Sequence, residues 1–237
     1  MARRLLKDRV ESVATLPTPD GPEDTPTASS RSVAPCVRRR WADLAKAAAA
    51  AGVLAGTAAI AATGVPSWEA DLFRVLNDVP GWVDNAVWLP MQLGSAWAPA
   101  IAAAAAWFIA KSWRPVVGSL VAGWGGWWLA KVVKDEIGRG RPYEVLGSHA
   151  VRPSALTEGL GFVSGHSTVA FACAAVLSPY LSRPWRVGVY SLAVVVALSR
   201  VVVGAHFPLD VVGGAALGLM LAYLWHLAVG VPEPAAG

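Results

Sequence analysis

The sequence contains little charge and almost no cysteine. Asp, Glu, Lys and Arg make up 15% of its 237 residues, whereas soluble domains usually contain about 25% charged residues. The two cysteines, Cys36 and Cys173, lie far apart, the first in a polar segment and the second in an apolar run. They predict neither a disulfide framework nor a cysteine metal cluster. An ordinary cytosolic enzyme and a small disulfide-stabilised scaffold are both disfavoured.

Long apolar stretches take the place of the missing charge. Hydrophobic residues make up 55% of the chain, and its mean hydropathy is +0.47. A helix that spans a membrane needs about 20 mostly apolar residues. Six stretches meet this requirement: 47–65, 89–110, 116–133, 165–181, 187–205 and 211–229. We therefore expect an all-α, integral membrane bundle of about six transmembrane helices.

Both ends of the chain and one inner segment depart from the apolar pattern. Residues 1–46 are rich in Pro, Ser, Thr, Arg and Asp, with nine basic and six acidic residues, so we expect a disordered basic tail. The three arginines at 38–40 could contact nucleic acid, but a cluster beside the membrane is the simpler interpretation, and no nucleic-acid partner is expected. The six-span domain then covers 47–230, followed by a short tail over 231–237. Residues 66–88 are too polar to span and are expected to lie along the membrane surface.

Basic residues predict the side of the membrane that each loop faces. Besides the basic tail, the short loops 111–115 and 182–186 each carry two basic residues. If the spans alternate, all three segments fall on one side, which the positive-inside rule identifies as cytoplasmic. The N-terminus is then cytoplasmic, and the loops 66–88, 134–164 and 204–210 face outward.

Small and aromatic residues predict where helices touch and where they end. Gly52 and Gly56 lie four residues apart, as do Gly214 and Gly218, and this spacing lets two helices pack closely. Five tryptophans lie near the ends of the expected spans, where aromatic belts form: Trp41, Trp68, Trp88, Trp113 and Trp185. We assign the tryptophans no chemical role.

Polar residues that a purely structural membrane protein does not need gather in the outward loops. Three of them are cations at the ends of expected spans: Lys134, Arg141 and Arg200. Arg200 follows a run of apolar residues, and charges at membrane depth are costly and usually functional. A structural ion pair between Arg200 and an acid such as Asp210 is the alternative. The planar fork of arginine suits a tetrahedral oxyanion and lysine adds a point charge, so the three cations favour phosphate binding.

The start of the fourth span adds to the same site. Ser164 is a natural helix N-cap, and Gly165 lets a ligand approach the free backbone N–H groups of that helix. A helix N-terminus is itself an anion site. Together with the three cations, it predicts a phosphate-binding core at the outer face of the bundle.

Two histidines flank this expected phosphate site. His206 precedes Pro208, which suits the first turn of the next helix, and Asp210 falls in that turn. Asp210 is then placed to accept a hydrogen bond from one imidazole nitrogen of His206 and to make the other more nucleophilic. His166, in the first turn of the fourth span, is placed to protonate a leaving oxygen. His226, alone on an apolar helix, is interpreted as structural.

No cluster in the sequence has the spacing of metal ligands. Asp135 and Glu136 are adjacent and cannot easily converge on one ion. We therefore expect no catalytic metal and no other cofactor.

Three motifs, in this order, resemble the signature of the type 2 phosphatidic acid phosphatase superfamily, which is K-x6-R-P, P-S-G-H and S-R-x5-H-x3-D. They stand here as Lys134-x6-Arg141-Pro142, Ser164-Gly165-His166 and Ser199-Arg200-x5-His206-x3-Asp210. The resemblance covers residues 66–229. In one departure, Val163 stands where the family usually has proline, and we expect from it a less rigid loop without loss of activity.

The resemblance implies roles that agree with those inferred from the residue types. His206 attacks phosphorus and becomes a phosphohistidine, Asp210 orients and activates it, and His166 protonates the leaving group. The remaining residues hold the phosphoryl oxygens: Lys134, Arg141, Ser164, Gly165 and Arg200. The resemblance thus implies a lipid phosphate phosphatase of the plasma membrane, with its active site facing the extracytoplasmic side. Its substrate classes would be polyprenyl (di)phosphates, phosphatidic acid or phosphatidylglycerol phosphate.

Three alternatives stand beside this interpretation. Soluble vanadate-dependent haloperoxidases share the signature, but six apolar stretches argue against that branch. Lipid phosphotransferases use the same histidine and require an acceptor pocket that the sequence does not display. A catalytically silent membrane scaffold of the same fold has no reason to keep His206 and Asp210. The sequence leaves the individual lipid and the oligomeric state open.

Overall fold

The computed structural model describes residues 37–147, 151–155 and 158–232. The expected tail over 1–46 therefore lies mostly outside the described residues, as do residues 233–237. In chain order the elements are β1 (Val37–Arg38), α2 (Trp41–Ala62), α3 (Ser67–Asn77), α4 (Trp82–Met91), η2 (Gln92–Gly94), α5 (Ala98–Ala110), α6 (Trp113–Ile137), α7 (Pro142–Leu146), α8 (Gly165–Leu177), η4 (Ser178–Tyr180), α9 (Arg183–Val202), α10 (Pro208–Val229) and β2 (Val231–Pro232). The two short strands pair antiparallel, so they join the start and the end of the described chain.

The centre of the bundle is α8. It contacts α5, α6, α9 and α10, and ten of its thirteen residues, most of them small, are buried. Gly214 and Gly218 of α10 permit the close approach, because a methyl group at Gly218 would collide with the carbonyl oxygen of Thr168. The expectation of close packing is confirmed for this pair. For the other pair it is wrong, since a Cβ at Gly52 or Gly56 would meet nothing within 4 Å.

Four helical segments of the described chain are long and apolar enough to cross a membrane, namely α2, α9, α10 and Trp113–Leu146, which begins with α6. The bounds of α2, α6, α9 and α10 agree with the expected spans to within a few residues, apart from the start of α2. This helix begins at Trp41, so residues 41–46 are helical and not part of a tail. The local reason is an acid in the first turn, Asp43, which favours the helix N-terminus and pairs with Lys46 one turn later.

A single helix over the second expected span, 89–110, is wrong. The chain bends by 69° between the segments Trp82–Gly94 and Ala98–Ala110. Pro90 and Pro99 remove backbone donors on both sides of the bend. Gly94 lies against α8, where a Cβ would stand 2.7 Å from the carbonyl oxygen of His166. Counted as one bent pair, these two segments give a fifth candidate span.

The fourth expected span, 165–181, is a shorter helix than its apolar length indicates. With 13 residues, α8 extends over about 20 Å, whereas the hydrocarbon core of a bilayer is about 30 Å thick. Because other helices surround α8, its ends are covered by protein and do not have to reach the bilayer surfaces. An all-α membrane bundle is therefore confirmed, but with four or five candidate spans among the described residues where six were expected.

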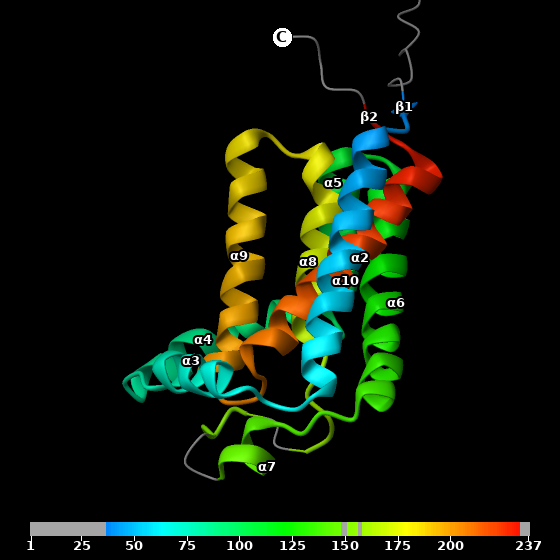
Figure 1. Ribbon diagram of the computed structural model, residues 1–237. Coiled ribbons are helices and arrows are strands. Elements are labelled where there is room, and N and C mark those ends of the chain that lie inside the picture. The colour runs from blue at the N-terminus through cyan, green and yellow to red at the C-terminus, as the bar shows by residue number, and fades with distance from the viewer. Residues whose placement is uncertain (1–36, 148–150, 156–157, 233–237) are drawn as a thin grey trace, which may run out of the picture. The chain divides into compact units, whose positions relative to one another are not determined.

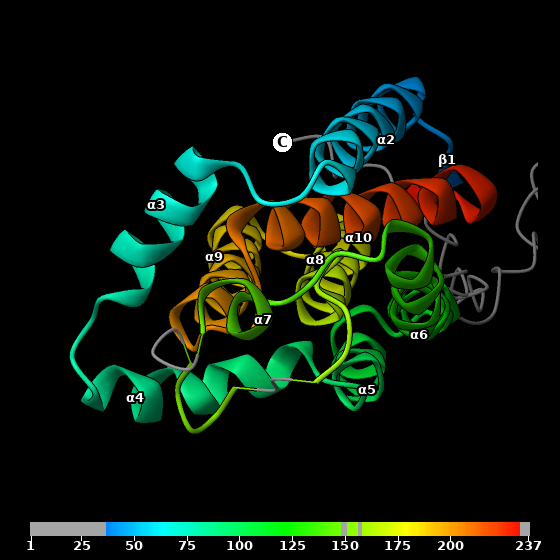
Figure 2. The same ribbon diagram turned by 60° about the horizontal axis from the view of Figure 1, so that its bottom comes forward.

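The bundle has two unlike ends (Figure 1). At one end, which we call the basic end, α2, α6 and α9 begin and α5, α8 and α10 finish. At the other, the loop end, α6 and α9 finish, α8 and α10 begin, and α3 and α4 run across the longer helices (Figure 2). The described parts of the three basic segments lie together at the basic end. Arg39 and Arg114 both donate hydrogen bonds to carbonyls of the last turn of α10, and β2 contacts η4 just before α9.

An aromatic contact fixes α3 at the loop end. The rings of Phe73, on α3, and Phe207, just before α10, lie 5.2 Å apart between centroids. Both are buried in one apolar cluster with residues of α9 and α10. This packing places another residue of α3, the fully buried Glu69, against the first turn of α10.

Candidate active site

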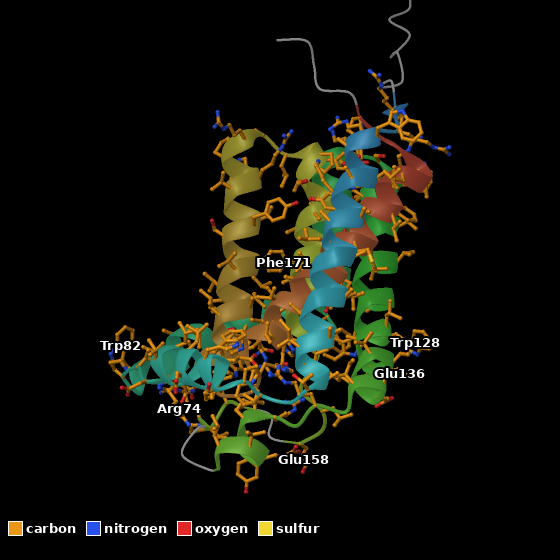
Figure 3. All side chains as sticks on the ribbon, in the orientation of Figure 1. Arg74, Trp82, Trp128, Glu136, Glu158 and Phe171 are labelled. Atoms are coloured by element: carbon orange, nitrogen blue, oxygen red, sulfur yellow. The ribbon has the colours of Figure 1, made fainter. Side chains whose placement is uncertain are left out.

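A pocket of about 240 Å³ opens at the loop end between α6, α8 and α9. Six residues that the sequence assigned to one site line it: Lys134, Arg141, Gly165, His166, Arg200 and His206. Nitrogen and oxygen atoms gather at this end of the helices, whereas Trp128 and Glu136 on α6 point away from the bundle (Figure 3). Residues from three separate stretches of the chain therefore meet in one cavity.

Two of the cations are held by the loop that precedes α8. Lys134, in the last turn of α6, donates from Nζ to the carbonyl oxygens of Leu160 at 2.7 Å and Gly161 at 2.8 Å. Arg141, at the N-cap position of α7, donates from Nε to the carbonyl of Gly159 at 2.9 Å. The loop 159–161 thus sets the direction of both side chains.

Arg200 is a cation buried almost completely, with 2% of its surface exposed. It lies in the last turn of α9, and its Nη1 stands 2.9 Å from the sulfur of Met91. Within residues 37–147, 151–155 and 158–232 it makes no ion pair, so the alternative of a structural pair with Asp210 is wrong. A buried cation without a countercharge is costly, and the pocket beside it is where an anion would offset that cost.

The five-residue gap between Arg200 and His206 has a simple structural reason. The chain leaves α9 in a turn in which the backbone N–H of His206 donates to the carbonyl of Arg200 at 3.1 Å. Gly204 supplies the positive φ of +81° within this turn. The turn brings the imidazole of His206 back to the pocket that Arg200 lines.

Asp210 stands behind His206, as its place in the first turn of α10 predicts. Its Oδ2 lies 3.5 Å from Nδ1 of His206 and accepts a hydrogen bond from the backbone N–H of Phe207 at 2.8 Å. Burial lowers the pKa of His206 well below its ordinary value, and Lys134, Arg200 and Arg141 lower it further. A backbone hydrogen bond with Gly161 acts in the opposite direction. His206 is therefore a neutral imidazole, the form that carries a lone pair.

The start of α8 faces the pocket through two residues but not through the third that the sequence named. Gly165 and His166 line the pocket, and the indole ring of Trp127 packs against His166 with 5.7 Å between ring centroids. Ser164 occupies the N-cap position, yet its hydroxyl makes no capping hydrogen bond. Its backbone N–H instead donates to the carbonyl of Asp210 at 2.8 Å. Ser164 thus joins α8 to α10 through its backbone, and its hydroxyl is buried without a hydrogen-bond partner among the described residues.

Two residues at the site have no role in the sequence interpretation. Arg139 donates from Nη1 to Oδ1 of Asp210 at 2.8 Å and also pairs with Glu69. Glu69 accepts a hydrogen bond from the backbone N–H of Leu209 at 2.8 Å. Arg139 lies inside the first motif, among the six residues between Lys134 and Arg141, and could have been noticed there. No local signal marks Glu69, because its segment precedes Arg139 by 70 residues.

Known proteins share sequence with this chain. Residues 115–231 match the PAP2 superfamily. Lipid A 1-phosphatase of Rhizobium johnstonii is 36% identical over 99 residues, which are 40% of this chain and 40% of that protein. Phosphatidylglycerophosphatase B of Bacillus subtilis is 35% identical over 135 residues, which are 52% of this chain and 62% of that protein. The chain thus covers less than two thirds of the length of these relatives.

Two solved structures share the fold. One is the crystal structure of a transmembrane PAP2 type phosphatidylglycerolphosphate phosphatase from Bacillus subtilis, with a TM-score of 0.59 and 24% identity, covering 76% of this chain and 94% of that one. The other is LpxE from Aquifex aeolicus, with a TM-score of 0.55 and 24% identity, covering 65% and 92%. The helical membrane fold expected from the sequence agrees with both.

Proposed function

The chain belongs to the PAP2 superfamily and is an integral membrane protein, and on that premise we propose that it hydrolyses a lipid phosphate ester. The observation that carries the proposal is the pocket at the loop end. Lys134, Arg141 and Arg200 line one cavity together with the N-terminus of α8, and a neutral imidazole backed by a carboxylate faces it. Such a cavity suits a phosphoryl group that is attacked by nitrogen.

The first step that we propose transfers the phosphoryl group to His206. Nδ1 of His206 faces Asp210, so Nε2 attacks phosphorus, and the bond from phosphorus to the lipid oxygen breaks. His166 gives its proton to the leaving oxygen, and the negative charge of the bound phosphate favours the protonated imidazole beforehand. Lys134, Arg141 and Arg200, with the N–H groups that begin α8, stabilise the charge on the phosphoryl oxygens.

The second step hydrolyses the phosphohistidine. Water attacks phosphorus, His166 takes a proton from that water, and the bond between phosphorus and Nε2 breaks to release phosphate. The proton returned in this step restores His166 for the next turnover. No metal ion takes part in this scheme, because the cations named above supply the positive charge.

An apolar groove favours a lipid over a soluble phosphate ester. The groove has a volume of about 140 Å³ and lies between α5, α8 and α9, with a lining of apolar side chains. Ala170 and Val196 line it, each one helical turn from a pocket residue, His166 and Arg200 respectively. A hydrocarbon chain in this groove would have its phosphate end at the pocket. The names of the relatives add lipid A 1-phosphate to phosphatidylglycerol phosphate, phosphatidic acid and polyprenyl diphosphate as candidate substrates.

Phosphate release from these four lipids by detergent-purified protein tests the proposal. His206→Ala is the blank, and His226→Asn, at a histidine outside the pocket, is the matched control. We expect release by the wild-type protein and by His226→Asn, and only the uncatalysed background from His206→Ala. Equal release from wild type and His206→Ala would contradict hydrolysis and support a silent scaffold. Consumption of lipid without release of phosphate would indicate a phosphotransferase.

We also propose that the loop end faces the extracytoplasmic side of the plasma membrane. The support is the grouping of basic segments at the basic end together with the positive-inside rule. In a Cys36→Ser background, Glu158→Cys at the loop end should react with a membrane-impermeant maleimide on intact cells (Figure 3). Arg186→Cys, at the basic end, should react only after the cells are permeabilised. The reverse pattern would invert the proposed orientation.

A further inference from the structure

Three charged side chains form a buried row of ion pairs from α3 to α10. Glu69 and Asp210 have no exposed surface, and Arg139, which lies between them, is 4% exposed. The superfamily match begins at residue 115, so Glu69 stands outside it. Charged residues of this kind are almost never fully buried unless they have partners, so the arrangement calls for a physical explanation.

The geometry divides the two oxygens of Asp210 between two tasks. Oδ1 accepts from Nη1 of Arg139 at 2.8 Å, while Oδ2 accepts from the N–H of Phe207 and faces Nδ1 of His206. Arg139 in turn pairs with both oxygens of Glu69, one of them at 3.3 Å. The carboxylate of Asp210 therefore cannot rotate away from His206 without breaking its ion pair with Arg139.

At the other end of this row of ion pairs, Glu69 bonds to the backbone of α10. Its Oε1 accepts from the N–H of Leu209 at 2.8 Å, next to Asp210 in the first turn of α10. Arg139 also donates from Nη2 to the carbonyl of Gly64 at 3.1 Å. The guanidinium is thus held from α3 and from the chain before it, independently of Asp210.

The second acid has an electrostatic consequence. A single buried arginine is already neutralised by Asp210, and burying a further carboxylate is costly. Without Glu69, the positive charge of Arg139 would neutralise Asp210, and the attraction between Asp210 and a positively charged His206 would be weaker. Glu69 offsets the charge of Arg139, so Asp210 keeps its capacity to stabilise the positive charge that the imidazole gains when Nε2 bonds to phosphorus.

We propose that Glu69 and Arg139 are positioning residues for the nucleophile, acting on His206 through Asp210. Arg139 fixes the carboxylate of Asp210, and Glu69 fixes Arg139 and balances its charge. The inference rests on the proposed function for its reaction. The other charged or titratable groups that face His206 are Lys134 from α6, Arg141 from the loop after it, His166 from α8 and Arg200 from α9, and all of them are unchanged in the variants below.

The first test is Glu69→Gln, which removes the charge but keeps an oxygen for the N–H of Leu209. We expect kcat to fall about 10-fold with KM unchanged, because the loss concerns the nucleophile and not lipid binding. The acid limb of the pH–rate profile should move to lower pH, since the uncompensated charge of Arg139 opposes protonation of His206. Arg139→Lys, which cannot span both carboxylates, should lower kcat about 100-fold.

Asp71→Asn is the matched control. Asp71 lies on the same helix as Glu69 but is exposed and pairs only with Arg74, one turn away, among the described residues. This variant should keep the wild-type kcat and pH profile. The double variant Glu69→Gln/Arg139→Lys should be no slower than Arg139→Lys alone, because both changes act on the same carboxylate.

Binding of orthovanadate, a phosphate analogue that takes a nitrogen ligand in the place of attack, gives a readout without turnover. We expect its affinity, from the thermal shift of the purified protein, to fall about 10-fold in Glu69→Gln and to be unchanged in Asp71→Asn. Wild-type kcat, pH profile and vanadate affinity in Glu69→Gln would overturn the inference. A kcat that falls only in proportion to the folded fraction, measured by circular dichroism, would overturn it too. If the wild type binds vanadate through His206 but releases phosphate from no lipid, the proposed function fails and the vanadate comparison still decides this inference.

Discussion

At the basic end of the bundle, arginines donate hydrogen bonds to backbone carbonyls, whereas at the loop end the buried side chains of Glu69, Arg139 and Asp210 pair with one another. Arg39, Arg40 and Arg114 donate to the carbonyls of Ala228, Pro232 and Val229. These contacts satisfy acceptors around the C-terminal end of α10 and complement its dipole. At the loop end Arg139 joins two acids that are 70 and 71 residues away in sequence.

We propose that the difference separates charge used for stability from charge used for chemistry. A cation on a helix C-terminus tolerates movement, because several carbonyls are within its reach. The carboxylate behind a nucleophile must keep one direction, so its partners come from rigid elements and are themselves fixed. In the proposed function Arg200 is the clearest case of the second use, since it is buried at the pocket and its one side-chain hydrogen bond among the described residues goes to the sulfur of Met91.

The largest difference in activity is expected between two alanine variants, one of an arginine at the loop end and one of an arginine at the basic end. Arg200→Ala should lower phosphate release by about 100- to 1000-fold, as does the loss of one donor to a developing oxyanion. The variant should still insert and fold. Arg114→Ala should leave kcat unchanged and lower stability by about 0.5 kcal/mol through the lost contact with α10. Near-normal turnover in Arg200→Ala would remove this residue from the phosphate site and erase the contrast.

Replacing one tightly packed glycine with alanine at each end should have different consequences for catalysis. A Cβ at Gly94 would lie 2.7 Å from the carbonyl oxygen of His166, and one at Gly118 would collide with the indole ring of Trp225 and lie 2.9 Å from a methyl group of Val176. Both Gly94→Ala and Gly118→Ala should destabilise the fold by about 1–3 kcal/mol. Only Gly94→Ala should also lower kcat, by about 10-fold, because it displaces His166. Thermal unfolding and phosphate release measured together test this, and equal losses of kcat would contradict it.

Local spacing explains how much of the site the sequence predicts. The gap from Arg200 to His206 is one turn, and the gap from His206 to Asp210 leads into the first turn of a helix. Such short-range geometry is written in consecutive residues, including Gly204 at positive φ and Pro208 at the helix start. The place of Ser164 is less simple, because its backbone N–H bonds to α10 while its hydroxyl is buried without a hydrogen-bond partner among the described residues. Its role in phosphate binding stays a prediction.

The contacts that the sequence does not predict depend on how distant elements pack. Glu69 reaches Arg139 only because Phe73 packs on Phe207 and carries α3 under α10. No local pattern encodes that contact. The break within 89–110 is not predicted for a different reason. Hydropathy averaged over a window does not reveal the bend that places Gly94 against α8. The apolar length of 165–181 does not predict the length of α8, because this helix is buried among other helices and not in contact with lipid along its whole length.

The two buried histidines offer a finer comparison of the ends. The pKa of His206 lies below its unfolded value of about 6.5, so the unfolded state takes up this proton first as the pH falls. The stability that neutral His206 contributes is therefore complete above pH 6.5 and is lost progressively below it. The acid limb of kcat/KM should likewise lie below pH 6.5. Lys134→Met should move that limb to higher pH, because one of the cations that oppose protonation is gone, whereas His226→Asn should not move it. A limb unchanged by Lys134→Met would contradict the cause assigned to the shift.

Removal of divalent metal should have the smallest effect, which is none. Among the described residues no three His, Cys, Asp or Glu side chains come close enough to hold an ion. At the loop end the acids Glu69 and Asp210 are instead engaged with Arg139, a competitor that a divalent ion would have to displace. Phosphate release should therefore be the same before and after dialysis against EDTA, with and without added Mg²⁺. Activity that EDTA abolishes and Mg²⁺ restores would mean that a metal ion supplies positive charge at this end. The contrast between catalytic arginines at the loop end and structural arginines at the basic end would then be weaker.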